Sequence, residues 1–425
     1  MNRSHKLSVR SRIGLAACAA VCATHPALAA AARAHEECRP TVAALPDLGF
    51  GGEAVAFNEG GVFVGGVANA VGDPTTTFES AWWDPSGRLH VLDTGLLGSE
   101  VNDINAHGEM VGNGYDPTSG ALRSYVRLHG RQVFLKGLGG TFTRARRINQ
   151  QGEIAGTATT TGDAGLFAVR WSSPNASPEV LPPAAGDSFS VGLGINREGF
   201  VSGNTQPNAP DNPFFPALWH GVSAPRRLAT TPALPWGTAY VVNDLGEAAG
   251  ELDSTDGSTS HAVVWRPAGR LVDLVGVPGG QRSSALDIAQ NGWVVGVSLT
   301  FPPDGGPPSF ADSFFWPGRG PLRILPTLQG AGVGFSSVHG IDSDGTASGF
   351  STDNSGMTRP TVWRCAQNLP AQPELAAAAA RKRSNASPPQ RRRRMSRMAW
   401  QFEQRQLTPA LDARGRVAAA QRTGR

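Results

Sequence analysis

The sequence predicts an all-β fold, and three observations support this prediction. The 425 residues include 53 Gly and 32 Pro but only 17% charged residues, a balance that favours turn-rich β-structure over helices. A pair of glycines four residues apart recurs seven times along the chain. A short apolar run that ends in tryptophan follows six of these pairs, so a unit of about 47 residues is repeated.

The glycine pairs mark the first hairpin of each unit. Three residues before each pair stands an Asn in five copies, Ala289 in the sixth and Asp342 in the seventh. Asn and Asp side chains bond their own backbone two residues further on, and Gly adopts the positive φ that closes a short loop. Four residues earlier the side chain is always small or β-branched, which suits close strand packing. The glycine pairs are Gly61/Gly65, Gly108/Gly112, Gly152/Gly156, Gly199/Gly203, Gly246/Gly250, Gly292/Gly296 and Gly345/Gly349; the small positions are Ala54, Val101, Ala145, Gly192, Ala239, Ala285 and Val338.

A second hairpin completes each unit. Turn segments such as residues 266–269 lead from the third strand into a fourth, which ends near Leu92, Leu274 or Leu325. Four strands in about 47 residues is the size of a propeller blade. The sequence therefore predicts a seven-bladed β-propeller of four-stranded blades over residues 30–365. The predicted third strands end at Trp83, Leu128, Trp171, Trp219, Trp265, Trp316 and Trp363.

The two ends of the repeat predict how the ring closes. The seventh copy stops after its third strand, at Cys365, whereas an isolated strand at residues 41–45 precedes the first copy. We therefore expect the N-terminal strand to complete the last blade. Cys38 and Cys365 both fall two positions after the tryptophan position of that blade, and an even pair of cysteines in an exported chain indicates a disulfide.

The termini indicate export. Four basic residues, an apolar run at residues 13–23 and a small-residue stretch near Ala29 have the layout of a secretory signal, so residues 1–29 are the predicted signal peptide. No later apolar segment is long enough to cross a bilayer. Residues 366–425 carry a net charge of +10 and predict a disordered basic tail rich in Ala, Pro and Arg. We expect a monomer in the periplasm or the extracellular medium.

The repeat resembles a known one. Asp47-Leu48-Gly49, Ile195-Asn196 with Gly199 and Gly203, and residues 261–265 (His-Ala-Val-Val-Trp) are similar to the units of the bacterial extracellular HAF-repeat family. The likeness covers residues 41–365, and the His-Ala-Phe signature itself is altered in most copies, for instance to Ser-Ala-Trp at residues 80–82. The resemblance implies export and a repeated β-fold. It implies no reaction and supplies no catalytic residue.

No local pattern predicts an active site. Residues 186–192 match the nucleophile block of GDSL-type esterases, but Gly192 occupies the repeated small position and the C-terminal Asp-x-x-His block of those enzymes does not occur. The turns at residues 253–257 and 352–356 lack the alternating acidic pattern of a Ca²⁺ loop. The nine His show no metal-ligand spacing. We therefore predict no catalytic residue, no metal site and no cofactor.

Candidate ligand-binding residues are those that break the repeat, because a repeated scaffold needs no variation. They lie two and three positions before the Asn position, on first strands that border the axial channel of a ring, where ring proteins bind ligands. Solvated variable positions are the alternative interpretation. The candidates are Asn102, Asp103, Arg146, Arg147, Tyr240, Asp287 and His339.

These observations favour a secreted binding or interaction module whose partner is an extracellular polymer or a protein. The alternative is a propeller enzyme, a glycoside hydrolase or lyase, that acts on extracellular polysaccharide through acidic residues converging from several blades. A purely structural repeat protein is a third possibility. Nucleic acid is not an expected partner, because the chain is exported and the basic tail has little aromatic interleaving.

Overall fold

The computed structural model describes residues 40–71, 77–209, 213–301, 310–330 and 333–365. The chain divides into two compact units at Cys38, and all described residues belong to the second. The predicted signal peptide, Cys38 and the basic tail therefore lie outside the described residues. Besides strands, the regular elements within these described ranges are two short 3₁₀ turns, η1 (Thr161–Asp163) and η2 (Pro267–Gly269), so the all-β prediction is confirmed.

The strands come in consecutive antiparallel groups of four, each strand paired with the next. The first three groups are β2 (Gly52–Phe57), β3 (Phe63–Ala68), β4 (Phe78–Trp83) and β5 (Leu89–Val91); β6 (Leu97–Ile104), β7 (Met110–Tyr115), β8 (Leu122–Leu128) and β9 (Arg131–Phe134); and β10 (Gly139–Ile148), β11 (Ile154–Thr160), β12 (Leu166–Trp171) and β13 (Glu179–Leu181).

The later groups repeat this arrangement. They are β14 (Phe189–Ile195), β15 (Phe200–Gln206), β16 (Phe215–His220) and β17 (Arg226–Arg227); β18 (Trp236–Val242), β19 (Ala248–Asp253), β20 (Ser260–Arg266) and β21 (Arg270–Asp273); β22 (Arg282–Ile288), β23 (Val294–Thr300), β24 (Phe310–Trp316) and β25 (Arg323–Ile324); and β26 (Ser336–Ile341), β27 (Ala347–Thr352) and β28 (Thr358–Cys365) with β1 (Pro40–Ala44).

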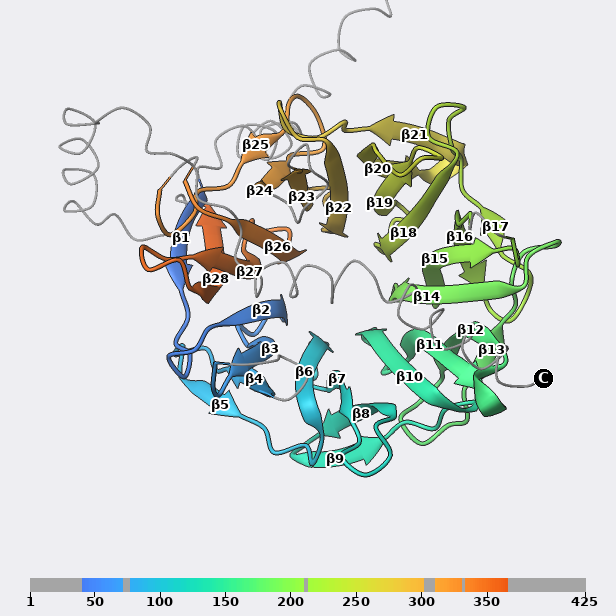
Figure 1. The fold of residues 1–425 in the computed structure, drawn as a ribbon, viewed down its shortest axis with the longest axis horizontal. Helices are drawn as coiled ribbons and strands as arrows, with labels where there is room; N and C mark the ends of the chain where they lie inside the picture. The colour runs from blue at the N-terminus through green and yellow to red at the C-terminus, as the bar shows by residue number, and fades with distance from the viewer. Residues whose placement is uncertain (1–39, 72–76, 210–212, 302–309, 331–332, 366–425) are drawn as a thin grey trace, which may run out of the picture. The chain divides into compact units, whose positions relative to one another are not determined.

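Pairing between groups is slight. Only one residue pair, Phe142 with Leu122, joins the second and third groups, and one pair, Ser260 with Arg282, joins the fifth and sixth. The first strand of each group contacts the first strand of the next, and β2 also contacts β26. In Figure 1 these first strands lie nearest the centre of the described unit, and the later strands of each group lie further out.

The N-terminal strand pairs with the C-terminal one. β1 runs antiparallel to β28 over its full length, from Pro40 opposite Cys365 to Ala44 opposite Thr361. Residues more than 300 positions apart in sequence thus share one four-stranded sheet. The expected pairing of the isolated N-terminal strand with the third strand of the seventh copy is therefore present in this structure.

The hairpin prediction is confirmed at the level of the backbone. The first Gly of every pair has a positive φ, between 73° and 81°. In the third copy the Asn149 side-chain oxygen accepts hydrogen bonds from the amides of Gln151 (3.0 Å) and Glu153 (2.9 Å). The side chain thereby satisfies two amides that the short loop leaves unpaired.

The Asn side chains also link neighbouring groups. Each Asn amide nitrogen donates to the backbone carbonyl at the equivalent position of the next copy, from Asn58 to Asn105 at 3.2 Å through to Asn243 and Ala289 at 3.1 Å. The series ends at Ala289, which has no amide to donate. In that copy the nearby Asn291 donates to the carbonyl of Ser343 instead, at 3.0 Å.

Replacing Asn196 by alanine is expected to lower the free energy of unfolding by about 2 kcal/mol. The variant loses the bond to the Asn243 carbonyl and leaves the amides of Glu198 and Phe200 without their acceptor. Urea unfolding followed by tryptophan fluorescence measures the change. The control is Asn69→Ala, an exposed side chain, which should shift stability by less than about 0.5 kcal/mol. Equal effects would contradict a structural role for the Asn series.

The repeated tryptophans pack between groups. All six are buried, with exposed fractions of 5% or less. Five donate their indole N–H to a backbone carbonyl that follows the fourth strand of the preceding group, as Trp219 does to Pro182 at 2.8 Å. Trp316 differs and donates to Gly320 at 3.0 Å. These side chains therefore hold neighbouring groups together and are not available for stacking on a ligand.

Candidate functional site

Each first strand contains a β-bulge at the same place. Directly after the small residue the register with the second strand shifts, so one residue of the first strand has no partner across the ladder. In β10, for example, Ala145 pairs with Gly156 and Arg147 pairs with Ala155. Arg146, between them, is the bulged residue. A bulge bends its strand and redirects a side chain. The seven bulged residues are Val55, Asn102, Arg146, Leu193, Tyr240, Leu286 and His339.

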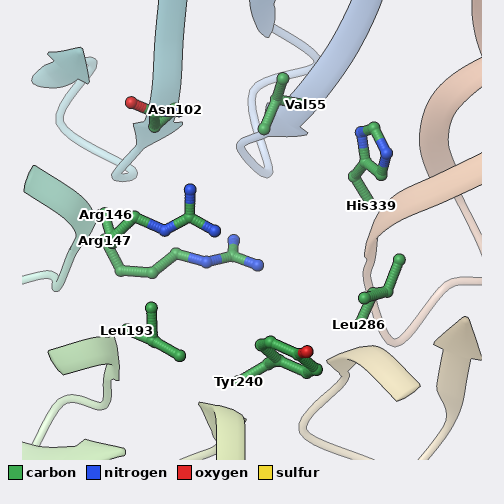
Figure 2. A pocket seen from close by; sticks show the side chains of 8 residues that line it. All are labelled: Val55, Asn102, Arg146, Arg147, Leu193, Tyr240, Leu286 and His339. Carbon is green, nitrogen blue, oxygen red and sulfur yellow. The ribbon is translucent and has the colours of Figure 1, made fainter. Parts of the chain in front are cut away.

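The bulged residues converge. Together with Arg147 they line one cavity of about 40 Å³, here called the bulge cavity, and Figure 2 shows their side chains approaching it from all sides. A volume of this size holds a few water molecules or one small chemical group. Four of the sequence-predicted candidates therefore share one cavity as bulged residues: Asn102, Arg146, Tyr240 and His339.

The other three candidates lie one position further along their strands. Asp103, Arg147 and Asp287 line a second cavity of about 120 Å³, here called the hairpin cavity, together with hairpin residues such as Asn58 and Gln150. Arg147 lines both cavities. The structure thus brings all seven candidates to two adjoining cavities, but sequence reasoning missed the bulge that separates them into two layers.

Arg147 is the centre of a three-residue ion cluster. Its guanidinium lies 3.6 Å from a carboxylate oxygen of Asp103 on β6 and 3.3 Å from one of Asp287 on β22. The second oxygen of each carboxylate accepts a backbone amide from a neighbouring group, that of Ile148 or Ile341, both at 2.9 Å. The cluster thereby connects four of the four-stranded groups.

Burial dominates the protonation of this cluster. It raises the pKa of the Asp103 carboxyl to about 6, although the Arg147 guanidinium acts in the opposite direction. Burial also raises the pKa of Asp287, and the Arg147 guanidinium again acts in the opposite direction. Burial lowers the pKa of Arg147, but the carboxylates of Asp287 and Asp103 outweigh it, so this guanidinium stays charged.

Arg146 lies in a different environment. Burial, reinforced by the neighbouring cation Arg144, lowers the pKa of its guanidinium to about 9, whereas Glu100 acts in the opposite direction. Arg146 is nevertheless only partly covered and keeps accessible surface. In Figure 2 its side chain extends beside that of Arg147 into the cavity.

The remaining polar side chains of the bulge cavity are engaged with protein groups. The Tyr240 hydroxyl donates to a carboxylate oxygen of Glu251 at 2.7 Å, and burial together with that carboxylate raises the tyrosine pKa well above its usual value. The Asn102 amide donates to Glu100 at 3.0 Å, and its oxygen accepts from Asn113. These contacts hold the Tyr240 and Asn102 side chains in place.

His339 is a buried, neutral histidine. Its exposed fraction is 5%, its Nε2 lies 3.0 Å from the Ser337 hydroxyl, and its Nδ1 lies 3.6 Å from a carboxylate oxygen of the fully buried Glu53. Burial first, then the cations Arg147 and Arg146, lower its pKa to about 3.

Other patterns weighed in the sequence have structural roles. In the esterase-like stretch, Ser190 is fully buried and donates to the Leu181 carbonyl at 2.8 Å, while Asp187 pairs with Arg227 at 2.7 Å. Within the described ranges, no group of three or more His, Cys, Asp or Glu side chains is arranged to hold a metal ion. The same residues include no helix with the length and apolar character needed to cross a membrane.

Comparison with known proteins reveals likeness in structure alone. No family model matches the sequence, and no curated protein does. The β-propeller domain of the Trilobed protease from Pyrococcus furiosus superposes with a TM-score of 0.51 at 9% identity, covering 74% of this chain and 92% of that domain. The fold is that of a β-propeller.

Further propeller-like structures are similar at lower scores. A prolyl endopeptidase structure matches at a TM-score of 0.49 and 13% identity, over 81% of this chain and 53% of that one. The virginiamycin B lyase from Staphylococcus aureus matches at 0.48 and 8% identity, over 77% of this chain and 99% of that one. At such scores and identities the likeness carries no activity over to this chain.

Proposed function

We propose that this protein is an exported binding module that holds its ligand on the axis of a seven-bladed β-propeller. The observation that carries the proposal is the convergence of seven bulged residues, one from each four-stranded group, on a single cavity. The hairpin and tryptophan positions around that cavity are repeated and serve packing, whereas the bulged positions differ in chemistry from copy to copy. Ring proteins bind ligands at such concave sites.

In this proposal the four-stranded groups are the blades, and β1 completes the last of them. The full-length pairing of β1 with β28 and the contact between β2 and β26 support a closed ring. The proposal includes a disulfide between Cys38 and Cys365. Cys365 is 4% exposed, and its sulfur lies 3.7 Å from the Gly345 carbonyl oxygen. Membership of the HAF-repeat family and secretion, suggested by the sequence, belong to the same proposal.

Filling the bulge cavity is expected to weaken the binding of an axial ligand strongly. Leu193→Trp introduces a larger side chain at a bulged position and should weaken the binding of any axial ligand at least tenfold, because the cavity is too small to hold both. The assay is an array of plant and bacterial cell-wall oligosaccharides and extracellular proteins, probed with the full chain. Mass spectrometry of soluble oligosaccharides incubated with the protein tests the enzyme alternative in parallel.

The matched control is Val180→Trp, the same new side chain at an exposed position on the outer strand β13. It should bind as the wild type does. Near-UV circular dichroism checks that both variants are folded, and Leu286→Phe fills the cavity from another blade if Leu193→Trp is not folded. Ligand binding that survives both cavity-filling variants would refute an axial site, and the release of shortened products would favour the enzyme.

A further inference from the structure

The second strand of the fifth group, β19, departs from the repeat at two positions. Glu251 and Asp253 stand one and three residues after the second Gly of the pair, where the other six copies have no acidic or basic residue. Residues two apart on a strand face the same side, so both carboxyl groups lie on one face of β19. A repeated scaffold needs no such variation, which makes this pair a candidate for a role of its own. The equivalent residues are Gly66, Asn113, Thr157, Asn204, Val297 and Phe350, and Ala68, Tyr115, Thr159, Gln206, Leu299 and Thr352.

Glu251 is buried and fully engaged. Its exposed fraction is 9%, and each of its two carboxylate oxygens accepts a hydrogen bond from a hydroxyl group. One donor is Tyr240 on β18, at 2.7 Å, and the other is Ser284 on β22. Tyr240 is at the same time a bulged residue of the bulge cavity. Glu251 therefore connects the fifth group to the sixth and is bonded directly to a side chain of that cavity.

Asp253 is more deeply buried and has fewer partners. Its exposed fraction is 2%, and one of its oxygens accepts from the Ser260 hydroxyl and lies 3.5 Å from a guanidinium nitrogen of Arg282. The other oxygen is buried without a hydrogen-bond partner among the described residues. The Arg282 side chain is 38% exposed and also donates to Ser260, at 3.0 Å. This hydrated and shared cation compensates a charge on Asp253 only in part.

Asp253 also lies at a junction. Ser260 and Arg282, which both contact it, are the residue pair that joins the sheets of the fifth and sixth groups. The groups whose charge acts on Asp253 are Glu251 on its own strand and Arg282 on β22, and Tyr240 on β18 is in turn affected by both carboxylates and by Arg282. Burial first, then the carboxylate of Glu251, raise the pKa of Asp253, against the Ser260 hydroxyl and the Arg282 cation.

We propose that Asp253 holds a proton at neutral pH and is a pH-sensitive switch at this junction, whose state reaches the bulge cavity through Glu251 and Tyr240. With the proton in place, the buried face of β19 carries the single negative charge of Glu251. When the proton is lost to solvent at alkaline pH, two like charges share that face, and the repulsion acts on the carboxylate that holds Tyr240. The effect on ligand binding rests on the proposed axial function, whereas the proton itself belongs to the junction.

The test follows the side-chain carboxyl carbons of ¹³C-labelled aspartate by NMR in the full chain between pH 4 and pH 9.5. The Asp253 signal is expected to titrate with a midpoint above pH 6, whereas the ordinary pKa of this group is 3.8. Asp253→Asn identifies the signal by its loss. The control is Asp256→Asn, an exposed carboxyl in the turn of the same hairpin, which should leave the signal unchanged. A midpoint below pH 6 would overturn the proposal.

Variants of the two neighbours test the cause. Glu251→Gln removes the like charge and should lower the midpoint of Asp253 by about one pH unit, whereas Arg282→Gln removes the cation and should raise it. If Asp253→Asn does not fold, these opposite shifts identify the Asp253 signal instead. A midpoint that neither variant moves would contradict a switch built from these charges.

The connection to the cavity is measured at Tyr240. The chain contains three tyrosines, so tyrosine labelled with ¹³C at Cζ gives three signals, and Tyr240→Phe assigns one of them. The Tyr240 signal is expected to shift with the same midpoint as Asp253 and to lose this shift in Asp253→Asn. A Tyr240 signal that stays constant while Asp253 titrates would overturn the switch. These measurements need no ligand, so a failure of the axial binding function in the Leu193→Trp experiment is distinguishable from a failure of this inference.

Discussion

Arg147→Met is expected to lower the free energy of unfolding by about 3–5 kcal/mol at pH 7.5. The substitution keeps most of the side-chain volume but removes the one guanidinium that contacts both Asp103 and Asp287. Two buried carboxylates then remain without their common cation, held by backbone amides alone. A buried charge without an opposite charge lowers the free energy of unfolding by more than a surface ion pair raises it.

The pH dependence distinguishes this mechanism from a loss of packing. The pKa of Asp103 already lies near 6 in the folded protein, above its ordinary value of 3.8, and without Arg147 the pKa values of both carboxyls rise further. A raised folded-state pKa means that the folded protein binds protons more readily than the unfolded chain, so the penalty is full at high pH and fades as the pH falls. The difference in unfolding free energy between wild type and Arg147→Met should therefore become smaller between pH 7.5 and pH 5.

The control is the triple variant Arg147→Met, Asp103→Asn and Asp287→Asn. It removes all three charges while each Asn oxygen can still accept the amide of Ile148 or Ile341, so most of the lost stability should return. Urea unfolding at both pH values measures all three proteins. A single variant and a triple variant that are equally destabilised, with no pH dependence, would show that the arginine acts through packing.

Acidification from pH 7 to pH 4 is expected to cost the wild type about 3 kcal/mol more than it costs His339→Gln. The pKa of His339 is about 3 in the folded protein and 6.5 in its ordinary state. Above pH 6.5 the ring is neutral in both states and contributes nothing. Below that pH His339 binds a proton in the unfolded chain but not in the folded protein. The free energy of unfolding therefore falls until the pH reaches about 3.

The charged groups that face His339 determine how strongly its pKa is lowered in the folded protein. Glu53 on β2 lies 3.6 Å from the ring and favours its protonation, whereas Arg146 and Arg147 on β10 oppose it. Asp103 contributes in the opposite direction, because its raised pKa adds stability as the pH falls below 6. The measured quantity is therefore the difference in unfolding free energy between wild type and His339→Gln at pH 7, 5.5 and 4. Parallel pH profiles would mean that Glu53 restores an ordinary histidine pKa.

The features that could be predicted from the sequence are those set by interactions between residues close in sequence. The turn at Asn149 and Gly152 depends on one side chain that bonds its own loop and on one backbone angle, so the Gly was visible in every copy and the Asn or Asp in six of the seven. The tryptophan position, represented by Trp219, recurs because the units pack against equivalent neighbouring units. The seven candidate residues were recognisable as departures from the repeat, and they do share the cavities.

The bulges could not be predicted in this way. Whether Arg146 or Arg147 is the extra residue in β10 depends on the register with β11, which no single-strand pattern reveals. The bond from the Asn196 amide to Asn243 was also missed, since the local turn already explained that asparagine. Both features arise from the contact between strands and between units.

The sequence by itself determined the repeat, its hairpins, its packing tryptophans and the all-β class, because each depends on interactions within about 47 residues that recur in every copy. Only the tertiary structure decided which charges meet. Arg147 and Asp287 lie 140 positions apart and face each other because their first strands share one centre. The same arrangement brings Arg146 and Arg147 into one cavity with side chains from six other first strands, and that setting, created by several units at once, is absent from any one of them.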